Sequence, residues 1–195
     1  MTNSSRVEFA RAVSGRGIVV ALTGGIACYK VAEIVSRLTQ AEARVTVLMT
    51  DAATRFVTPL TLQALSGRPV YSSQWQHIES SDPQHINLAR SADLMLIAPC
   101  TMDMLAKLVI GRTDDVVSLV CSAVDRSTTP VLLAPSMNAA MWGQASTQRN
   151  IAQLREDGFH LIGPDDGWQA CRTSGPGRMS EPLEILDAIA SLVSR

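Results

Sequence analysis

The chain has 195 residues, of which 46% are hydrophobic, 18% charged and 4% aromatic, and its formal net charge is −1. This length suits one well-packed domain, and the near-zero charge and few aromatic side chains argue against binding of nucleic acid or an anionic membrane surface. No apolar run approaches the ~18 residues of a membrane span. We therefore expect a globular, cytoplasmic protein that binds neither nucleic acid nor membrane.

The N-terminal segment is rich in serine and arginine and lacks an apolar signal core. We expect residues 1–16 to form a flexible tail and residues 17–195 to form a single domain. An arginine-rich transit peptide is the alternative, which Glu8 and the short length of the segment disfavour.

The four cysteines are widely spaced and include no C-x-x-C pair. This spacing disfavours a zinc site, so we expect no bound metal and reduced thiols. Cys100 and Cys121 lie in apolar surroundings typical of a core. Cys28 lies near the start of the first predicted helix, and Cys171 lies in a loop rich in glycine and proline.

Residues 17–23 form a short apolar run that predicts a buried strand. Gly24, Gly25 and Ile26 follow, and a helical pattern covers residues 27–40. Glycines before a helix N-terminus suit an anion such as a phosphate. The segment has neither G-x-G-x-x-G nor a P-loop lysine–serine pair, so an ordinary tight turn between strand and helix is the alternative.

Further apolar runs predict strands at residues 45–50, 94–98, 131–134 and 159–162. Helical patterns separate them, and residues 71–84 read as a surface loop. This order predicts a single-domain α/β fold: a Rossmann-like, open parallel sheet with helices on both faces. In such folds, ligands bind at the carboxyl ends of the strands.

Several polar residues fall at this rim. Thr50 ends the second strand, and Thr101 is expected to cap a helix whose free N–H groups face a ligand. His85 lies before the strand at 94–98. A lone histidine is more often a surface or packing residue than a proton carrier.

The segment Pro135-Ser136-Met137-Asn138-Ala139-Ala140-Met141-Trp142 follows the strand at 131–134. Pro135 has no N–H group for a sheet ladder and therefore ends the strand. Asn138 offers a donor and an acceptor, which suit a carboxylate or an amide. The alternative is a turn whose methionine and tryptophan side chains pack as core.

A glycine-rich stretch at residues 163–182 precedes the last predicted helix. Long loops without secondary structure in compact domains are often lids. Within it lie Ala170-Cys171 and Gly175-Pro176-Gly177-Arg178-Met179. On these residues alone, a structural thiol at Cys171 is slightly favoured over a catalytic one.

These motifs together resemble a known family. Pro-x-Met-Asn-x-x-Met-Trp at 135–142 resembles the substrate-recognition motif of the flavin-dependent cysteine decarboxylases, and the similarity runs from about Gly17 to the C-terminus. His-Ile-x-Leu at 85–88 resembles the catalytic-histidine region. Ala-Cys followed by Gly-x-Gly-Arg-Met-x-Glu-Pro resembles the flap of members that convert 4'-phosphopantothenoylcysteine to 4'-phosphopantetheine in coenzyme A biosynthesis.

The resemblance implies flavin mononucleotide (FMN) as the cofactor. It implies His85 as the catalytic acid/base, Asn138 as the group that binds the substrate carboxylate, and Cys171 as the proton donor of the reductive half-reaction. The implied cofactor positions are Gly24, Gly25, Ile26, Thr50, Thr101, Met102, Asp103, Met104 and Ser136. The implied substrate positions are Asn138, Met141, Trp168, Ala170 and Met179.

Two positions depart from the family pattern. Asp103 stands where the family usually has asparagine, so an acceptor-only carboxylate replaces an amide and puts that flavin contact in doubt. Arg172 stands where the family often has glycine, so a different flap turn is expected.

The resemblance also implies a homo-oligomer, a trimer or a dodecamer of four trimers, with flavin at the subunit contacts. In many bacteria the decarboxylase is fused to a C-terminal synthetase. Because this chain ends at Arg195, we expect the synthetase to be a separate protein.

Four other functions are alternatives. A decarboxylase of peptides with a C-terminal cysteine is disfavoured by the Gly-x-Gly-Arg-Met run. A non-catalytic flavin-binding regulator should lack the catalytic histidine or cysteine, and this chain has both His85 and Cys171. A prenylated-flavin synthase lacks support from its usual motifs, and a dinucleotide dehydrogenase lacks the glycine fingerprint.

Overall fold

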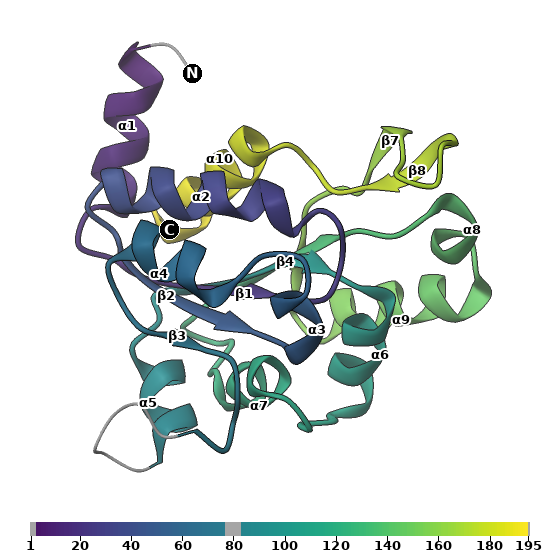
Figure 1. The fold of residues 1–195 in the computed structure, drawn as a ribbon, viewed down its shortest axis with the longest axis horizontal. Coiled ribbons are helices and arrows are strands. Elements are labelled where there is room, and N and C mark those ends of the chain that lie inside the picture. Colours follow the sequence, from purple (N-terminus) through teal and green to yellow (C-terminus); the bar gives the residue numbers. More distant parts are fainter. Residues whose placement is uncertain (1–2, 77–82, 195) are drawn as a thin grey trace.

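The computed structural model of the chain describes residues 3–76 and 83–194 (Figure 1). Its centre is a six-stranded sheet in the order β3-β2-β1-β4-β5-β6, with every neighbouring pair parallel. The strands are β1 (Gly17–Leu22), β2 (Arg44–Met49), β3 (Val70–Tyr71), β4 (Leu94–Cys100), β5 (Val131–Pro135) and β6 (His160–Leu161). The predicted single-domain α/β architecture is confirmed.

Successive side chains of β1 enter two different cores. Ile18, Val20 and Leu22 pack into one cluster, and Val19 and Ala21 pack into the other. A strand whose two faces are both covered has no polar face, which explains why the sequence shows a continuous apolar run rather than an alternation.

Helices cover both faces of the sheet (Figure 1). The helices of the first core are α1 (Asn3–Val13), α2 (Cys28–Gln40), α4 (Pro59–Ser66) and α10 (Pro182–Val193). Those of the second core are α5 (Gln84–Arg90), α6 (Met102–Ile110), α7 (Val116–Ala123) and α9 (Ala145–Glu156). Two single-turn helices, α3 (Asp51–Thr54) and α8 (Ala139–Trp142), follow the ends of β2 and β5.

The N-terminal segment differs from the expected flexible tail over residues 1–16. It forms α1, in which Phe9 and Val13 are buried in the first core and which contacts α10. The two side chains lie four residues apart and therefore on one face of the helix. Composition did not reveal this short apolar stripe, because serine and arginine dominate the segment.

The glycine-rich stretch is also not a structureless loop. β7 (Asp165–Trp168) and β8 (Ser174–Arg178) pair as an antiparallel hairpin, which forms a second sheet. Glycine and proline have low strand propensity, so the sequence pattern predicted a loop. The hairpin is held instead by its own ladder and by contacts with the rim of the main sheet.

The loop predicted over residues 71–84 begins with the last residue of β3, at the edge of the sheet. His77 lies outside the described residues. The structure ends this stretch at Gln84, where α5 starts.

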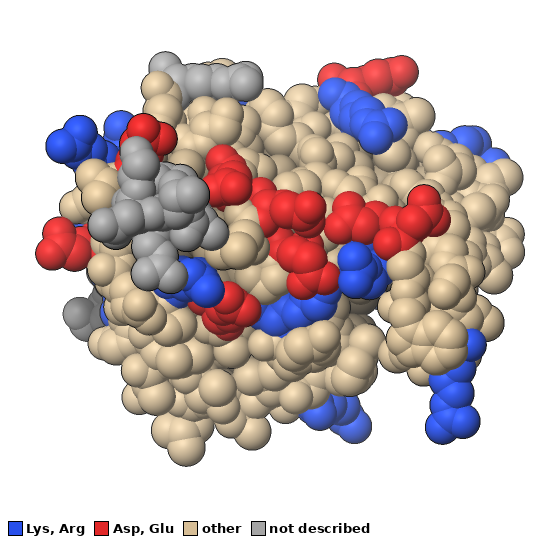
Figure 2. Space-filling view, turned by 90° about the horizontal axis from the view of Figure 1, so that it is seen from above, with Lys and Arg blue, Asp and Glu red and all other residues tan. Residues whose placement is uncertain are grey.

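Among the described residues, no helix is both long and apolar enough to cross a membrane. Figure 2 shows the face seen from the top of Figure 1, where acidic side chains form a row across the middle with basic side chains beside them. Because the two signs of charge lie side by side, the described residues of this face form no continuous basic field of the kind that attracts nucleic acid.

Candidate functional site

A cavity of about 630 Å³ lies at the carboxyl ends of β1, β4 and β5, beside the β7–β8 hairpin. This is the edge of an open α/β sheet at which ligands are expected. Its lining residues are Gly25, Ile26, Ala27, Tyr29, Lys30, Thr101, Met102, Ser136, Met137, Asn138, Met141, Trp168, Gln169, Ala170, Cys171, Gly177, Arg178, Met179 and Glu181.

The cavity brings together most of the site residues predicted from sequence. They come from the turn after β1, the start of α6, the segment after β5 and the hairpin. The predicted residues that line it are Gly25, Ile26, Thr101, Met102, Ser136, Asn138, Met141, Trp168, Ala170, Cys171 and Met179.

Four predicted cofactor positions do not line this cavity, and each has another contact. A Cβ atom at Gly24 would lie 2.5 Å from the Cβ of Ala52, so glycine lets the turn after β1 pack against α3. The Thr50 hydroxyl caps α3, and Met104 is buried in the second core. Asp103 turns toward Lys107.

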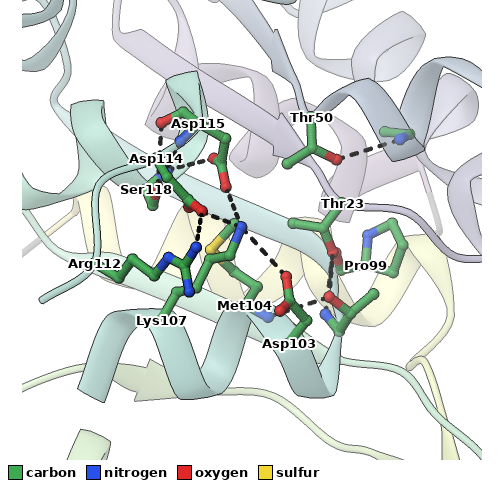
Figure 3. Close-up of polar contacts among 12 residues, drawn as sticks. Thr23, Thr50, Pro99, Asp103, Met104, Lys107, Arg112, Asp114, Asp115 and Ser118 are labelled. Carbon is green, nitrogen blue, oxygen red and sulfur yellow. Dashed lines mark hydrogen bonds and ion pairs between the residues drawn. The ribbon is translucent and has the colours of Figure 1, made fainter. Parts of the chain in front are cut away.

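Thr101, which lines the cavity, belongs to a hydrogen-bonded junction between the ends of β1 and β4 (Figure 3). The buried Thr23 hydroxyl donates to the Pro99 carbonyl and accepts from the Thr101 N–H at 3.1 Å. Thr101 in turn caps α6, because its Oγ1 accepts from the Met104 N–H at 3.3 Å. The predicted helix cap is therefore confirmed, and the segment after β1 is joined to the start of α6.

The turn before α2 presents backbone donors. Within the described part of the chain, no hydrogen bond uses the N–H groups of Gly25, Ile26 or Ala27. The α2 N-terminus also has no side-chain cap. Free N–H groups at a helix N-terminus favour an anionic group such as a phosphate.

Asn138 is the N-cap of α8. Its Oδ1 accepts from the Met141 N–H at 2.8 Å, and its backbone carbonyl accepts from the Trp142 N–H. The cap explains why the chain turns here, directly after Pro135 ends β5. Because the amide oxygen is occupied, the NH₂ group is the part of the side chain that can donate to a ligand carboxylate.

Cys171 lies in the turn between β7 and β8. Its Sγ is 3.0 Å from the Thr173 Oγ1 and 3.5 Å from the Gln169 Oε1. Arg172 has φ +65°, a left-handed conformation that favours glycine. Arg172 therefore has a backbone conformation that glycine adopts readily. Arginine in place of the family's glycine does not by itself change the backbone of this turn.

Cys171 is exposed, whereas Cys28, Cys100 and Cys121 are buried. Burial raises the pKa of all three buried thiols, that of Cys121 to about 12. A raised pKa keeps a thiol protonated and unreactive at neutral pH. The accessible thiol is therefore the one that lines the cavity.

His85 lies elsewhere on the same chain. It is on α5 and lines a separate cavity of about 330 Å³ with Trp75, Leu88 and Val116 among its walls. The two cavities share no lining residue. The structure thus places His85 and Cys171 in different cavities of one chain.

Lys107 lies among three carboxylates, one in the first turn of α6 and two in the segment that follows α6 (Figure 3). Its Nζ lies 2.9 Å from Asp114, 2.9 Å from Asp115 and 3.4 Å from Asp103. Burial opposes the charge of the ammonium group, but the hydrogen bonds to Asp115 and Asp114 and the charges of Asp115 and Asp103 together raise the pKa of Lys107. The Asp103 carboxylate, a departure from the family pattern, is therefore partly neutralised.

Sequence reasoning missed a charged triad on the cavity wall. The Glu181 Oε1 lies 2.9 Å from the Lys30 Nζ and 3.2 Å from the Arg178 Nη1. The triad joins α2, the hairpin and the start of α10, and it leaves one positive charge in excess. The signal for this triad in the sequence was Lys30, which lies in the first turn of the helix after the glycine turn.

Comparison with known proteins places the chain among flavoproteins. The Flavoprotein family model matches residues 7–194. The Coenzyme A biosynthesis bifunctional protein CoaBC of Haemophilus influenzae is 46% identical over 183 residues, 94% of this chain and 45% of the relative. CoaBC of Escherichia coli K12 is 44% identical over 175 residues, 90% of this chain and 42% of the relative. The chain thus spans less than half the length of these relatives.

Solved structures show the same fold. A cysteine-to-serine mutant of PPC decarboxylase complexed with pantothenoylaminoethenethiol has a TM-score of 0.82 and 28% identity, covering 93% of this chain and 100% of that chain. The FMN-dependent cysteine decarboxylase SpaF has a TM-score of 0.79 and 26% identity, covering 94% and 99%. The FMN binding protein AtHal3 has a TM-score of 0.78 and 29% identity, covering 89% and 94%.

Proposed function

The chain belongs to the Flavoprotein family, and on this basis we propose that it is an FMN-dependent phosphopantothenoylcysteine decarboxylase. It would convert 4'-phosphopantothenoylcysteine to 4'-phosphopantetheine in coenzyme A biosynthesis. One observation carries the proposal: Asn138 and Cys171 line a single cavity together with the glycine turn at the start of α2. The relatives named for coenzyme A biosynthesis, and the decarboxylase with a bound enethiol, support the choice of substrate.

The chemistry of the cavity wall suits FMN. The N–H groups of Gly25 and Ile26 and the hydroxyl groups of Thr101 and Ser136 are neutral donors, which a phosphate and a polar ring edge require. Glu181 is the one acidic side chain among the lining residues, and Lys30 and Arg178 neutralise it. Four predicted cofactor positions do not line the cavity and make other contacts within the chain. They remain predictions: Gly24, Thr50, Asp103 and Met104.

FMN, when bound, supplies a reversible two-electron oxidation of the cysteinyl side chain. The residues of the chain then control binding and protons. The Asn138 NH₂ group donates to the substrate carboxylate. Once the side chain is a thioaldehyde, the carboxylate is β to an electron-withdrawing carbon, and carbon dioxide leaves to give an enethiol. The Cys171 S–H donates the proton that the enethiol carbon gains as the two electrons return.

Substrate positions follow from the same cavity. Four predicted substrate positions with largely apolar side chains line the cavity beside Asn138 and Cys171: Met141, Trp168, Ala170 and Met179. Their apolar surfaces suit the apolar parts of the substrate on either side of its amide groups. The excess positive charge of the Lys30–Glu181–Arg178 triad is compatible with an anionic substrate.

We infer a homo-oligomer, a trimer or an assembly of trimers, with this cavity at a subunit contact. Ile26, Tyr29 and Met141 border the cavity and are 57%, 63% and 39% exposed, a large apolar surface for the rim of a site. His85 lies in a separate cavity of its own chain. A neighbouring copy that supplied His85 would complete the acid/base set.

The first test is the absorbance spectrum of the purified protein, followed by mixing with phosphopantothenoylcysteine. We expect flavin bands, release of carbon dioxide and formation of phosphopantetheine. Cys171→Ser should still release carbon dioxide but accumulate the enethiol. Cys121→Ser is the matched control, since it alters a buried thiol of α7 outside the cavity, and it should form product normally.

Three outcomes would contradict the proposal. A flavin-containing protein that is inert toward this substrate but decarboxylates a peptide with a C-terminal cysteine would support the alternative enzyme. A flavin-containing protein inert to both would support a binding regulator. A colourless protein that FMN cannot reconstitute would exclude all three.

A further inference from the structure

Gln169 is a buried polar residue in the wall of the cavity. It follows β7 directly and is 7% exposed. Its Nε2 donates to the Gly175 carbonyl at 3.1 Å and to the Pro176 carbonyl at 2.8 Å. Its Oε1 accepts from the Ala139 N–H at 3.1 Å. A buried amide whose donors and acceptor are all used holds its neighbours in one arrangement.

The same oxygen also reaches the thiol. The Cys171 Sγ lies 3.5 Å from the Gln169 Oε1, within reach of an S–H donor. Backbone bonds close the turn around it, from the Gln169 N–H to the Thr173 carbonyl at 2.8 Å and from the Arg172 N–H to the Gln169 carbonyl at 2.9 Å. One side-chain oxygen therefore joins the thiol to the first residue of α8, next to Asn138.

This link has a chemical reason under the proposed function. Asn138 binds the carboxylate, and the proton must reach the carbon that the carboxylate has left. The two groups therefore act on neighbouring atoms of the same substrate, although they lie on segments more than thirty positions apart in the chain. Proton transfer requires the donor within hydrogen-bond reach of its target, and a displacement of about 1 Å can cost ~10²-fold in rate.

We propose that Gln169 is a positioning residue, which holds the Cys171 thiol against the start of α8 so that its proton is delivered where the carboxylate departed. The proposal rests on the proposed function. In this step the Cys171 S–H bond breaks and a C–H bond forms on the enethiol carbon that carried the carboxylate, while bound FMN in its reduced form would supply the two electrons. The thiolate then regains a proton from solvent.

Two variants separate positioning from folding. Gln169→Leu keeps the approximate size of the side chain and removes all its hydrogen bonds. Gln169→Glu keeps the acceptor, and its protonated form also restores one donor. We therefore expect Gln169→Glu to recover activity as the pH falls, whereas Gln169→Leu does not.

The decisive readout is a single turnover with FMN-loaded protein and phosphopantothenoylcysteine. For Gln169→Leu we expect release of carbon dioxide within ~3-fold of the parent, but formation of phosphopantetheine slower by ~10²-fold, with the enethiol accumulating. Gln148→Leu is the matched control. That side chain donates to the Trp142 carbonyl at 2.6 Å but is exposed and does not line the cavity, so both steps should stay unchanged.

A second readout needs no substrate. Arg172 lies in the turn that Gln169 holds, so tryptic cleavage after Arg172 in the native protein should be at least ~10-fold faster in Gln169→Leu and unchanged in Gln148→Leu. Equal slowing of both chemical steps, or normal product formation, would overturn the proposal while leaving the proposed function intact. A parent protein that releases no carbon dioxide would overturn the proposed function, and the positioning role with it.

Discussion

At the residue scale, the β7–β8 hairpin packs so closely against the backbone of the segment after β5 that only glycine fits at the contact. A Cβ atom at Gly177 would lie 2.3 Å from the Met137 carbonyl oxygen, and the Gly177 carbonyl accepts from the Met137 N–H at 2.9 Å. Gly177 also has φ +125°, a conformation that side chains rarely adopt. The hairpin is therefore seated on the segment that carries Asn138 by direct backbone contact.

Gly177→Ala should separate the hairpin from this segment. We expect kcat/KM for decarboxylation to fall by about 10²-fold, because Cys171 and Asn138 lose their relative position. The control is Gly158→Ala, where φ is +86° but nothing lies within 4 Å of the added Cβ. It should lose about 1 kcal/mol of stability and keep its kcat/KM. Equal kinetic losses in the two variants would contradict this reading.

At the element scale, Lys107 ties α6 to the start of α7. Asp115 caps α7 through a capping box, and the Lys107 ammonium, whose side chain is 17% exposed, bonds to it at 2.9 Å. Asp115 thus lies at the N-terminus of α7, where an acidic side chain is favourable. The cluster also includes Asp103 in the first turn of α6.

Lys107→Met should lower the free energy of unfolding by about 2 kcal/mol, because Asp115 would be left partly buried beside Asp103 and Asp114 without a counter-ion. Urea unfolding would measure this. Arg55→Met is the control: it breaks an exposed pair with Asp51 at 3.7 Å and should cost less than about 0.5 kcal/mol.

The pH dependence of the stability difference between Lys107→Met and the parent protein follows from the direction in which the pKa of Lys107 is shifted. The pKa of Lys107 is raised in the folded protein, so its contribution is complete below the ordinary lysine value of about 10.4 and is lost only as the pH rises through the higher folded value. The stability difference between Lys107→Met and the parent should therefore be constant from pH 7 to about pH 9. A difference that disappeared in that range would contradict the assignment.

At the scale of the whole molecule, one chain does not unite its predicted catalytic groups. His85 lies in the smaller cavity, and Asn138 and Cys171 line the larger one. A closed ring of identical subunits can bring the first cavity of one copy against the second cavity of the next. The proposed oligomer is therefore a requirement of the chemistry if His85 is the acid/base.

Mixed oligomers test this arrangement. His85→Ala and Cys171→Ser should each be inactive in product formation, but random co-assembly should restore activity at about one quarter of the sites, where both wild-type residues meet. Asn138→Ala mixed with Cys171→Ser is the control, because both residues line the cavity of one chain and cannot complement. A first mixture that remained inactive would show that His85 does not act across a subunit contact.

Local patterns in the sequence determined the order of the elements. The apolar runs at β1, β4 and β5 predicted buried parallel strands, and Thr101 predicted the start of α6, because strand burial and helix capping depend on residues close together in the chain. The same patterns placed Asn138 and the glycine turn at the ligand-binding rim of the sheet.

The tertiary structure alone decided the rest. The β7–β8 hairpin forms from residues of low strand propensity, α1 docks through only a short apolar stripe, and Gln169 bonds to Ala139 thirty positions away. Whether His85 shares a cavity with Cys171 was equally invisible in the sequence. Each of these features depends on contacts between segments distant in the chain, whose energies come from burial and backbone pairing in three dimensions rather than from local periodicity.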